Sequence, residues 1–350
     1  MNRRRILAAA AGLVCLFLGG ITAEAQQAMV KPTDWLAYKA KFLGPGGRII
    51  DDGNGGISHS EGQGYGLLLA YLAGNAADFE QIWYFTRTEL LIRDDGLAAW
   101  SWNPGATPHV TDINDATDGD LLIAYALAQA GKGWSRSDYT EAAAKIAGTL
   151  LDKAIVRSGG RTLLLPGVSG FAAADRSDGP VINPSYWVFE AFPVMNALVP
   201  STKWQELFDN GHRLISQIQF GPQKLPADWV SLRRQPKLAD GLPFEFGYNS
   251  LRIPLYLMRG GVDDKALLAR LHAGMADASS SIRLYDLSSN SVKATLDDPG
   301  YRIINHIMAC ILDGSVLPAT AKSFAPTLYF PSTLHLLGLA YVTEKHPECL

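Results

Sequence analysis

The sequence has few cysteines and no cluster of basic residues. Three of its 350 residues are cysteine, which is too few for a fold held together mainly by disulfides. Cys310 and Cys349 lie near the C-terminal end, and the sequence leaves open whether they form a disulfide or remain thiols. Lysine and arginine number 31 against 34 aspartate and glutamate. Because no stretch is strongly basic, we do not expect nucleic acid as a partner.

Long apolar stretches are also scarce. The longest covers residues 6–21, after three arginines and ahead of the tripeptide Ala-Glu-Ala at 23–25. This order is typical of an export signal with its cleavage site, and the run is shorter than the roughly 20 residues that a membrane-spanning helix needs. We therefore expect residues 1–25 to be a signal peptide. Residues 26–350 would form a single domain, periplasmic or secreted, without membrane association after the signal is removed.

Motifs for metal or cofactor chemistry are missing as well. The seven histidines are scattered, and neither a His-Glu-x-x-His nor a Gly-x-Ser-x-Gly motif occurs. The glycine-rich segment at residues 62–66 lacks the preceding strand and the lysine of a phosphate-binding loop, and Glu61 beside it would repel a phosphate. The sequence therefore predicts neither a metal site nor a cofactor.

Helical periodicity dominates what the sequence does contain. Apolar residues recur at steps of three and four through most of the chain, whereas alternating strand patterns are few. Asp138 and Glu141 are placed as the cap of one helix and its reciprocal partner. This pattern favours one all-α domain in which successive helices pair around a common axis. Helices are expected near residues 33–43, 61–74, 79–90, 118–130, 139–150, 184–199, 204–218, 249–259, 263–275, 301–313 and 332–344, and strands at 161–165 and, as a hairpin, 281–295.

The segment around Glu61 is the first candidate for chemistry. Glu61 stands among three alternating glycines and directly precedes the apolar run 67–72. A carboxyl group at the mouth of an apolar helix is partly desolvated, which raises its pKa as a proton donor at neutral pH requires. The alternative is an ordinary helix start, with Ser58 or Ser60 as the cap and Glu61 in the first turn, where the helix dipole favours it.

A second carboxylate-rich segment, residues 114–122, also leads into an amphipathic helix. Asp115 and Asp120 there are best interpreted as capping groups. Asp118 would lie at the helix entrance and is easily kept ionised there. Paired with Glu61, it could flank a substrate bond, with Glu61 as the neutral acid and Asp118 as the charged base or electrostatic support.

Large aromatic residues in loops indicate a binding surface for a polymer of sugars. Such rings occur in segments rich in proline, glycine or asparagine, where core packing explains them less readily than on a helix stripe. Trp83 and Trp204 lie on clear helical stripes and are expected in the core, and Trp134 is expected to pack after a turn. The candidate platforms are Trp100, Trp102, Tyr186, Trp187, Trp229 and Tyr248.

Residues 60–66 (Ser-Glu-Gly-Gln-Gly-Tyr-Gly) and 116–134, which begin Ala-Thr-Asp-Gly-Asp-Leu-Leu, resemble the two signature segments of glycoside hydrolase family 8. Residues 183–186, 225–229 and 248–256 extend the similarity over most of the chain. It is greatest toward the periplasmic cellulases that accompany bacterial cellulose synthesis. The resemblance implies a barrel of six α-hairpins, the (α/α)6 fold, with a few short strands and a long substrate groove.

The resemblance also implies roles for individual residues. Glu61 corresponds to the proton donor, and Asp118 to the second active-site aspartate. Tyr248 and Arg252 match groove residues that position the sugar and the water. The family's Tyr-Asp-Ala-x-Arg motif, whose aspartate serves as the base in many members, has Asn249 at that position here. An amide can orient a water molecule but cannot take its proton at neutral pH.

Three accounts of this departure are open: Asp118 acts as the base, a carboxylate elsewhere reaches in, or hydrolysis is slow and the protein mainly binds glucan. We expect the first. The resulting hypothesis is endo-hydrolysis of β-1,4-glucan by paired carboxylates, as an accessory to cellulose synthesis. The alternatives are a weakly active or non-catalytic glucan-binding partner of the cellulose synthase and export complex, and a chitosanase or lichenase of the same family.

Overall fold

Twelve α-helices form the body of residues 28–350, the part of the chain that this computed structural model describes. The predicted signal peptide at residues 1–25 lies outside the described residues. No helix within the described part combines the length and the apolar character needed to cross a membrane. The helices are α1 Pro32–Phe42, α2 Ser60–Leu72, α3 Ala76–Phe85, α4 Thr117–Gly133, α5 Ser137–Lys153, α6 Ala191–Leu198, α7 Thr202–Gln217, α8 Ile253–Arg259, α9 Lys265–Met275, α10 Pro299–Asp313, α11 Ala319–Lys322 and α12 Tyr329–Lys345.

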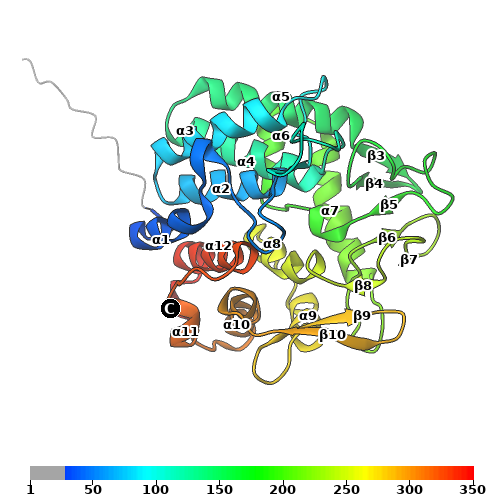
Figure 1. Ribbon diagram of the computed structural model, residues 1–350. Helices are drawn as coiled ribbons and strands as arrows, with labels where there is room; N and C mark the ends of the chain where they lie inside the picture. The colour runs from blue at the N-terminus through cyan, green and yellow to red at the C-terminus, as the bar shows by residue number, and fades with distance from the viewer. Residues whose placement is uncertain (1–27) are drawn as a thin grey trace, which may run out of the picture.

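The helices form two concentric layers. In the inner layer, α2, α4, α8 and α12 are buried around nearly their whole circumference. Helix α2 packs against α4 and α12, α4 against α6, and α10 against both α8 and α12, so the inner helices follow one another around an axis (Figure 1). Each inner helix is preceded in sequence by an outer one. The predicted barrel of six α-hairpins is confirmed.

The outer helices bury only one face. In α7, an apolar stripe that includes Trp204, Leu207 and Leu214 faces inward, while the intervening positions are polar. This is the pattern of a helix with one side in water. The core positions predicted for Trp83 and Trp204 are confirmed by exposures of 6% and 0%. Trp134 packs edge-on against Phe79, as expected.

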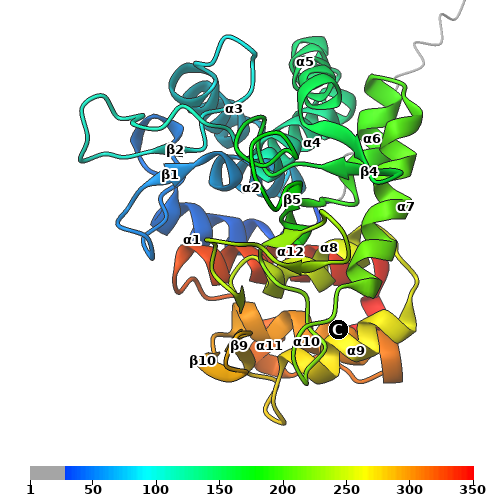
Figure 2. The same ribbon diagram turned by 90° about the vertical axis from the view of Figure 1, so that its right-hand side faces the viewer.

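Short antiparallel strands lie in the connections between helices. Strands β3 to β10 lie beside the helical body, on the right of Figure 1, and β1 and β2 form a separate pair at the left of Figure 2. The predicted hairpin is present as β9 and β10, and the predicted strand as β4. The two-residue strands were not predicted, because segments this short carry no alternating pattern. The strands are β1 Ser58–His59, β2 Ser101–Trp102, β3 Ile155–Ser158, β4 Arg161–Leu164, β5 Val181–Ile182, β6 Val230–Ser231, β7 Lys237–Leu238, β8 Glu245–Phe246, β9 Ile282–Asp286 and β10 Ser291–Leu296.

Two expected helices are shorter than the apolar pattern suggested. The segment 184–199 begins with a 3-10 turn at Pro184–Tyr186, and α6 starts only at Ala191. The segment 249–259 begins with a 3-10 turn at Ser250–Arg252, and Pro254 lies in the first turn of α8. Proline lacks the amide that an interior helical position uses, so it starts a helix rather than extending one.

The cap of α5 differs from the prediction. Asp138 does not cap this helix: the N-cap position is Arg136, whose side chain makes no cap hydrogen bond and pairs with Asp138 instead.

A disulfide joins Cys310 of α10 to Cys349 beside the C-terminus. The sequence had left open whether these two cysteines are bonded.

Candidate active site

Helices α2 and α4 begin side by side because glycines allow their backbones to approach closely. A methyl group on Gly119 would lie 2.7 Å from the backbone nitrogen of Glu61, and one on Gly64 would lie 2.5 Å from Cβ of Leu122. Any larger side chain at either position would force the helices apart. The glycines of both sequence segments therefore bring Glu61 and Asp118 to neighbouring helix starts.

The cap of α2 is a histidine rather than a serine. His59 Nδ1 accepts a hydrogen bond of 2.9 Å from the amide of Gly62, so the predicted capping by Ser58 or Ser60 is wrong. The other ring nitrogen of His59 lies 3.3 Å from a carboxylate oxygen of Asp51. This pair holds the first turn of α2, and with it Glu61, in a fixed orientation.

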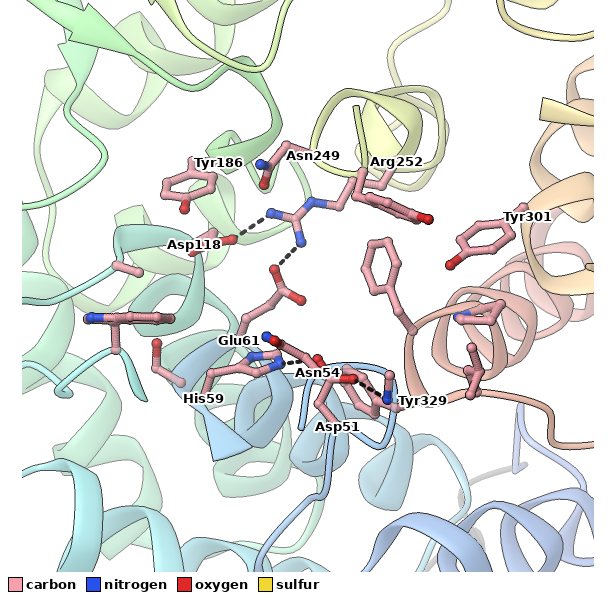
Figure 3. A pocket seen from close by; sticks show the side chains of 18 residues that line it. Asp51, Asn54, His59, Glu61, Asp118, Tyr186, Asn249, Arg252, Tyr301 and Tyr329 are labelled. Atoms are coloured by element: carbon pink, nitrogen blue, oxygen red, sulfur yellow. Dashed lines mark hydrogen bonds and ion pairs between the residues drawn. The ribbon is translucent and has the colours of Figure 1, made fainter. Parts of the chain in front are cut away.

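Arg252 links the two candidate carboxyl groups. One terminal nitrogen of its guanidinium donates to Glu61, and the other donates to Asp118 over 2.5 Å (Figure 3). The Arg252 side chain is 1% exposed and that of Asp118 is 2% exposed, whereas that of Glu61 is 19% exposed. Glu61 is thus the member of this group that a ligand in the cavity can reach.

The pKa directions of the two carboxyls are the reverse of the prediction. Burial raises the pKa of Asp118 to about 7, Arg252 opposing the rise and the charge of Glu61 adding to it. Burial would also raise the pKa of Glu61, but the charges of Arg252 and His59 outweigh it and lower that pKa. A proton shared by the pair therefore favours Asp118 over Glu61.

The two carboxyl groups bind the same guanidinium. Each accepts from a different terminal nitrogen of Arg252. A nucleophile and an acid are typically about 5 Å apart in retaining glycosidases, and a base and an acid about 6.5–9.5 Å apart in inverting ones, where a water lies between them. The shared guanidinium favours a position of Asp118 on the same side of a bound sugar as Glu61. The expected role of Asp118 as the base stays a prediction.

A cavity of about 590 Å³ opens over this group. Trp100, Tyr186 and Tyr248 line it together with Asn249, as predicted for platform and groove residues. Tyr248 is half exposed and Trp100 is 38% exposed, so their rings are available to a ligand.

The other predicted platforms do not line the cavity. Trp102 packs edge-on against Phe85, and its indole nitrogen donates to Glu89. Trp229 stacks on Phe171 with nearly parallel rings. Trp187 is 1% exposed and belongs to the core.

Asn249 lies on the cavity wall with a carboxylate behind it. Its amide nitrogen donates to Asp228 over 3.3 Å, and Figure 3 shows its amide oxygen turned toward the interior of the site. Asp228 is 2% exposed and does not line the cavity. Asn249 and Glu61 lie on opposite sides of the Arg252 guanidinium in Figure 3.

Comparisons with known proteins bear on this arrangement. The model for glycosyl hydrolases family 8 matches residues 13–344. The chain belongs to this family. It is 41% identical over 225 residues to a protein named "Probable endoglucanase" from Novacetimonas hansenii, an alignment that covers 63% of this chain and 65% of that protein. It is 40% identical over 227 residues to an endoglucanase from Cellulomonas uda, covering 64% of this chain and 62% of the relative.

A solved structure extends the similarity to the fold. The family 8 endoglucanase from Klebsiella pneumoniae superimposes with a TM-score of 0.80 at 33% identity, covering 90% of this chain and 99% of the other. The two curated relatives align over slightly less than two thirds of their own lengths.

Several residues of this family 8 site were not predicted. Tyr301 and Phe330, at the starts of α10 and α12, line the cavity and pack near Tyr248. Tyr329 also lines it, and its hydroxyl has no hydrogen-bond partner within residues 28–350. They were missed because they lie at or just before the starts of helical patterns, where an aromatic ring is typical of the core. Asp51 could have been predicted, because it lies eight residues before His59 and close to the motif at residues 60–66.

The described residues offer one group that could hold a metal ion, and it is far from this chemistry. It consists of His346, Glu348 and Cys349. Because Cys349 is bonded to Cys310, its sulfur has no thiolate to offer a metal. The group therefore does not fit a metal site.

Proposed function

We propose that this protein hydrolyses β-1,4-glucan within the chain, with Glu61 as the proton donor. The observation that carries this proposal is the position of Glu61: it is the more exposed of the two carboxyls that Arg252 binds, and aromatic rings lie on either side of it. Figure 3 shows Tyr186 on one side and Tyr301 on the other. Sugar rings stack on aromatic faces, so a polymer bound across both would present an internal bond to Glu61.

Cleavage requires a proton on Glu61. The pKa of Asp118 is raised and that of Glu61 is lowered, so a proton favours Asp118. We propose that this proton moves to Glu61 within the group that Arg252 holds together when a sugar binds. A glycosidic oxygen placed against Glu61 accepts the proton as its bond to the anomeric carbon breaks.

Asp118 then has a different role from that of a base. With its proton given up, its charge stays paired with Arg252, and its second oxygen accepts a hydrogen bond of 2.8 Å from the amide of Gly119. We propose that Asp118 stores the proton, fixes Arg252 and holds the sugar at the cleavage position. Two buried groups at the cavity have no hydrogen-bond partner among residues 28–350, the hydroxyls of Ser60 and Tyr329, and they are available to sugar hydroxyls.

The biological setting is a further part of this proposal. We propose that residues 1–25 are removed on export, that residues 26–350 act as one catalytic domain in the periplasm or outside the cell, and that the domain trims glucan during cellulose synthesis. The support is the signal-like N-terminus and the motif resemblance described above. N-terminal sequencing of the exported protein should give Gln26, and deletion of the gene should alter the amount or order of cellulose that the cells produce.

The activity is tested on carboxymethyl-cellulose by measuring viscosity and reducing ends together. An endo-acting enzyme lowers the viscosity early, while few ends have been released. Glu61→Gln should lose at least about 10³-fold in rate because the amide has no proton to donate, with its melting temperature close to that of the parent. Chitosan and mixed-linkage glucan are the competing substrates.

Two results would overturn the proposal. One is a parent protein that binds glucan but releases no reducing ends from any of the three polymers, which would identify a non-catalytic glucan-binding protein. The other is an Asp118→Asn variant that cleaves as well as the parent, which would remove Asp118 from the reaction.

A further inference from the structure

The water that attacks the anomeric carbon needs a proton acceptor on the side opposite Glu61. Asp118 binds the same guanidinium as Glu61. Beyond that guanidinium in Figure 3, the cavity wall presents the amide of Asn249. An amide alone cannot hold the proton at neutral pH. A proton acceptor must therefore lie next to the amide.

The carboxylate of Asp228 lies behind the amide, and several hydrogen bonds fix its position. One of its oxygens accepts hydrogen bonds of 2.9 Å from the backbone amides of Gly247 and Ser250, and the other faces the side-chain nitrogen of Asn249 at 3.3 Å. A methyl group on Gly247 would lie 2.5 Å from that second oxygen, so the turn accepts only glycine here.

These contacts fix the orientation of the Asn249 amide. A carboxylate only accepts hydrogen bonds, so the NH2 group of Asn249 must face Asp228, and its oxygen must face the cavity. Burial raises the pKa of Asp228, while its hydrogen bonds to the 247–250 turn oppose the rise and Glu245 adds to it. Asp228 is thus a better proton acceptor than an ordinary aspartate, although no substrate can touch it.

We propose that Asp228 is the final acceptor of the water's proton, which reaches it through the amide of Asn249. This inference rests on the proposed function and supplies its missing base. Asp228 acts through Asn249, so it is a positioning and relay residue rather than one that touches the substrate.

The step balances as follows. As the water oxygen bonds to the anomeric carbon, its O–H bond breaks and the proton passes to Oδ1 of Asn249. A proton of Nδ2 passes at the same time to Asp228, which leaves Asn249 as an imidic acid and Asp228 neutral. Glu61 gives its proton to the leaving oxygen. After the products leave, Asp228 returns its proton to Nδ2, Oδ1 releases its proton to solvent, and solvent reprotonates the Glu61–Asp118 pair.

The first test uses azide, an anionic nucleophile that needs no base. Asp228→Asn and Asn249→Ala should each lower the rate of cello-oligosaccharide hydrolysis by about 10²-fold or more. Sodium azide should restore cleavage in both and yield a glycosyl azide that mass spectrometry detects. Azide should not restore Glu61→Gln, which lacks the acid. A fold defect is not repaired by azide, so restoration separates a role in the reaction from a purely structural one.

The second test exchanges the two groups. In the double variant Asp228→Asn/Asn249→Asp, the amide at 228 donates to a carboxylate at 249, which now faces the cavity directly. This variant should recover at least tenfold over Asp228→Asn alone. The matched control is Asp178→Asn, because Asp178 is also buried and accepts a backbone amide, that of Asp240, but lies outside the cavity. Its rate per folded molecule should equal that of the parent.

The outcomes separate this inference from the proposed function. If the parent cleaves and Asp228→Asn keeps the rate of the Asp178→Asn control, the relay is wrong and the proposed function stands. The relay is also wrong if azide restores neither variant, or if the first product retains the β configuration by NMR. If the parent does not cleave at all, both fail. Should Asp228→Asn not fold, Asn249→Ala with azide decides the question alone.

Discussion

The two sides of the cleavage site are built in different ways. On the acid side, Glu61 and Asp118 stand at the first turns of two inner helices, and Arg252 binds both directly. On the water side, the cavity wall is a turn at residues 247–250 that presents a neutral amide, with Asp228 one layer behind it. One side exposes a carboxyl to the substrate, whereas the other keeps its carboxyl out of reach.

The two sides differ in what stabilises the charge of their carboxyl groups. On the acid side, the charges of Glu61, Asp118 and Arg252 offset one another. The position of one shared proton decides which carboxyl is neutral. On the water side, no cation among residues 28–350 is in direct contact with Asp228, and backbone amides stabilise the carboxylate instead. Substitutions on the acid side should therefore change charge balance and stability together, while those on the water side should change the rate with little change in stability.

The largest effect should come from removing the cation of the acid side. Arg252→Met leaves two buried carboxyls without a counter-charge and should cost about 3–5 kcal/mol of unfolding free energy, with hydrolysis reduced below detection. Urea denaturation and reducing-end assays measure the two effects. The matched control is Arg259→Met, which breaks the buried pair with Glu190 outside the cavity. It should lose stability while its folded fraction keeps the parent's pH profile.

A steric change at the helix starts should come next. Gly119→Ala places a methyl group against the first turn of α2 and should cost about 1–3 kcal/mol through overpacking, together with most of the activity. Gly148→Ala is the control, because nothing lies within 4 Å of the added methyl group in α5. It should gain up to about 1 kcal/mol from helix propensity. Equal melting temperatures for the two variants would contradict the close packing of α2 on α4.

The dependence of kcat/KM on pH should have an upper limb from the acid side of the site and a lower limb from the water side. Because the Glu61–Asp118 pair loses its shared proton near the raised pKa of Asp118, about 7, kcat/KM should fall about tenfold per unit above that pH. Activity should also fall at low pH, as protons bind to Asp228, whose pKa burial raises. Asp118→Asn should remove or shift the upper limb and leave the lower one. An upper limb that is unchanged in that variant would contradict the shared proton.

The same proton should affect stability. Asp118 holds a proton when folded up to about pH 7 but releases it near pH 4 when unfolded. Folding therefore takes up a proton between these values, and this group's contribution to the unfolding free energy declines as the pH rises through that window. Urea denaturation of the parent and of Asp118→Asn at pH 5 and pH 8 measures the difference.

The smallest effect should come from the exposed platform. Tyr248→Ala removes a half-exposed ring and should raise KM for cello-oligosaccharides several-fold, since stacking of a ring is worth about 1 kcal/mol, while kcat changes little. Tyr84→Ala is the control, because Tyr84 is similarly exposed, at 55%, and lies outside the cavity. A large loss of kcat in Tyr248→Ala would give this ring a part in the chemistry itself.

Much of the fold was predictable because its information is local. The periodic stripes of α5, α7 and α10 bury one face against neighbouring helices, so each helix could be recognised from its own residues. The boundaries that failed were set by Pro184 and Pro254, where proline starts or interrupts a helix within an apolar run. The short strands near the cavity depend on distant partners and carried no signal of their own.

The sequence predicted several residues of the site correctly, but it did not predict which of the two carboxyl groups carries a proton. Glu61 and Asp118 were found because glycines mark where their helices meet. Their protonation was predicted the wrong way round, because it depends on Arg252, which is 191 residues from Glu61 in sequence. Tyr301 and Phe330 were missed for the same reason: only the closed barrel brings the starts of α10 and α12 beside the 247–250 turn.

The bond between Cys310 and Cys349 has a consequence for the cavity wall. It ties the last residues of the chain to α10, across a loop that contains α11 and all of α12. Tyr329 and Phe330, at the start of α12, line the cavity and thus lie within a covalent ring. In a compartment that keeps thiols reduced this ring would be open, and the cavity wall would be held by packing alone.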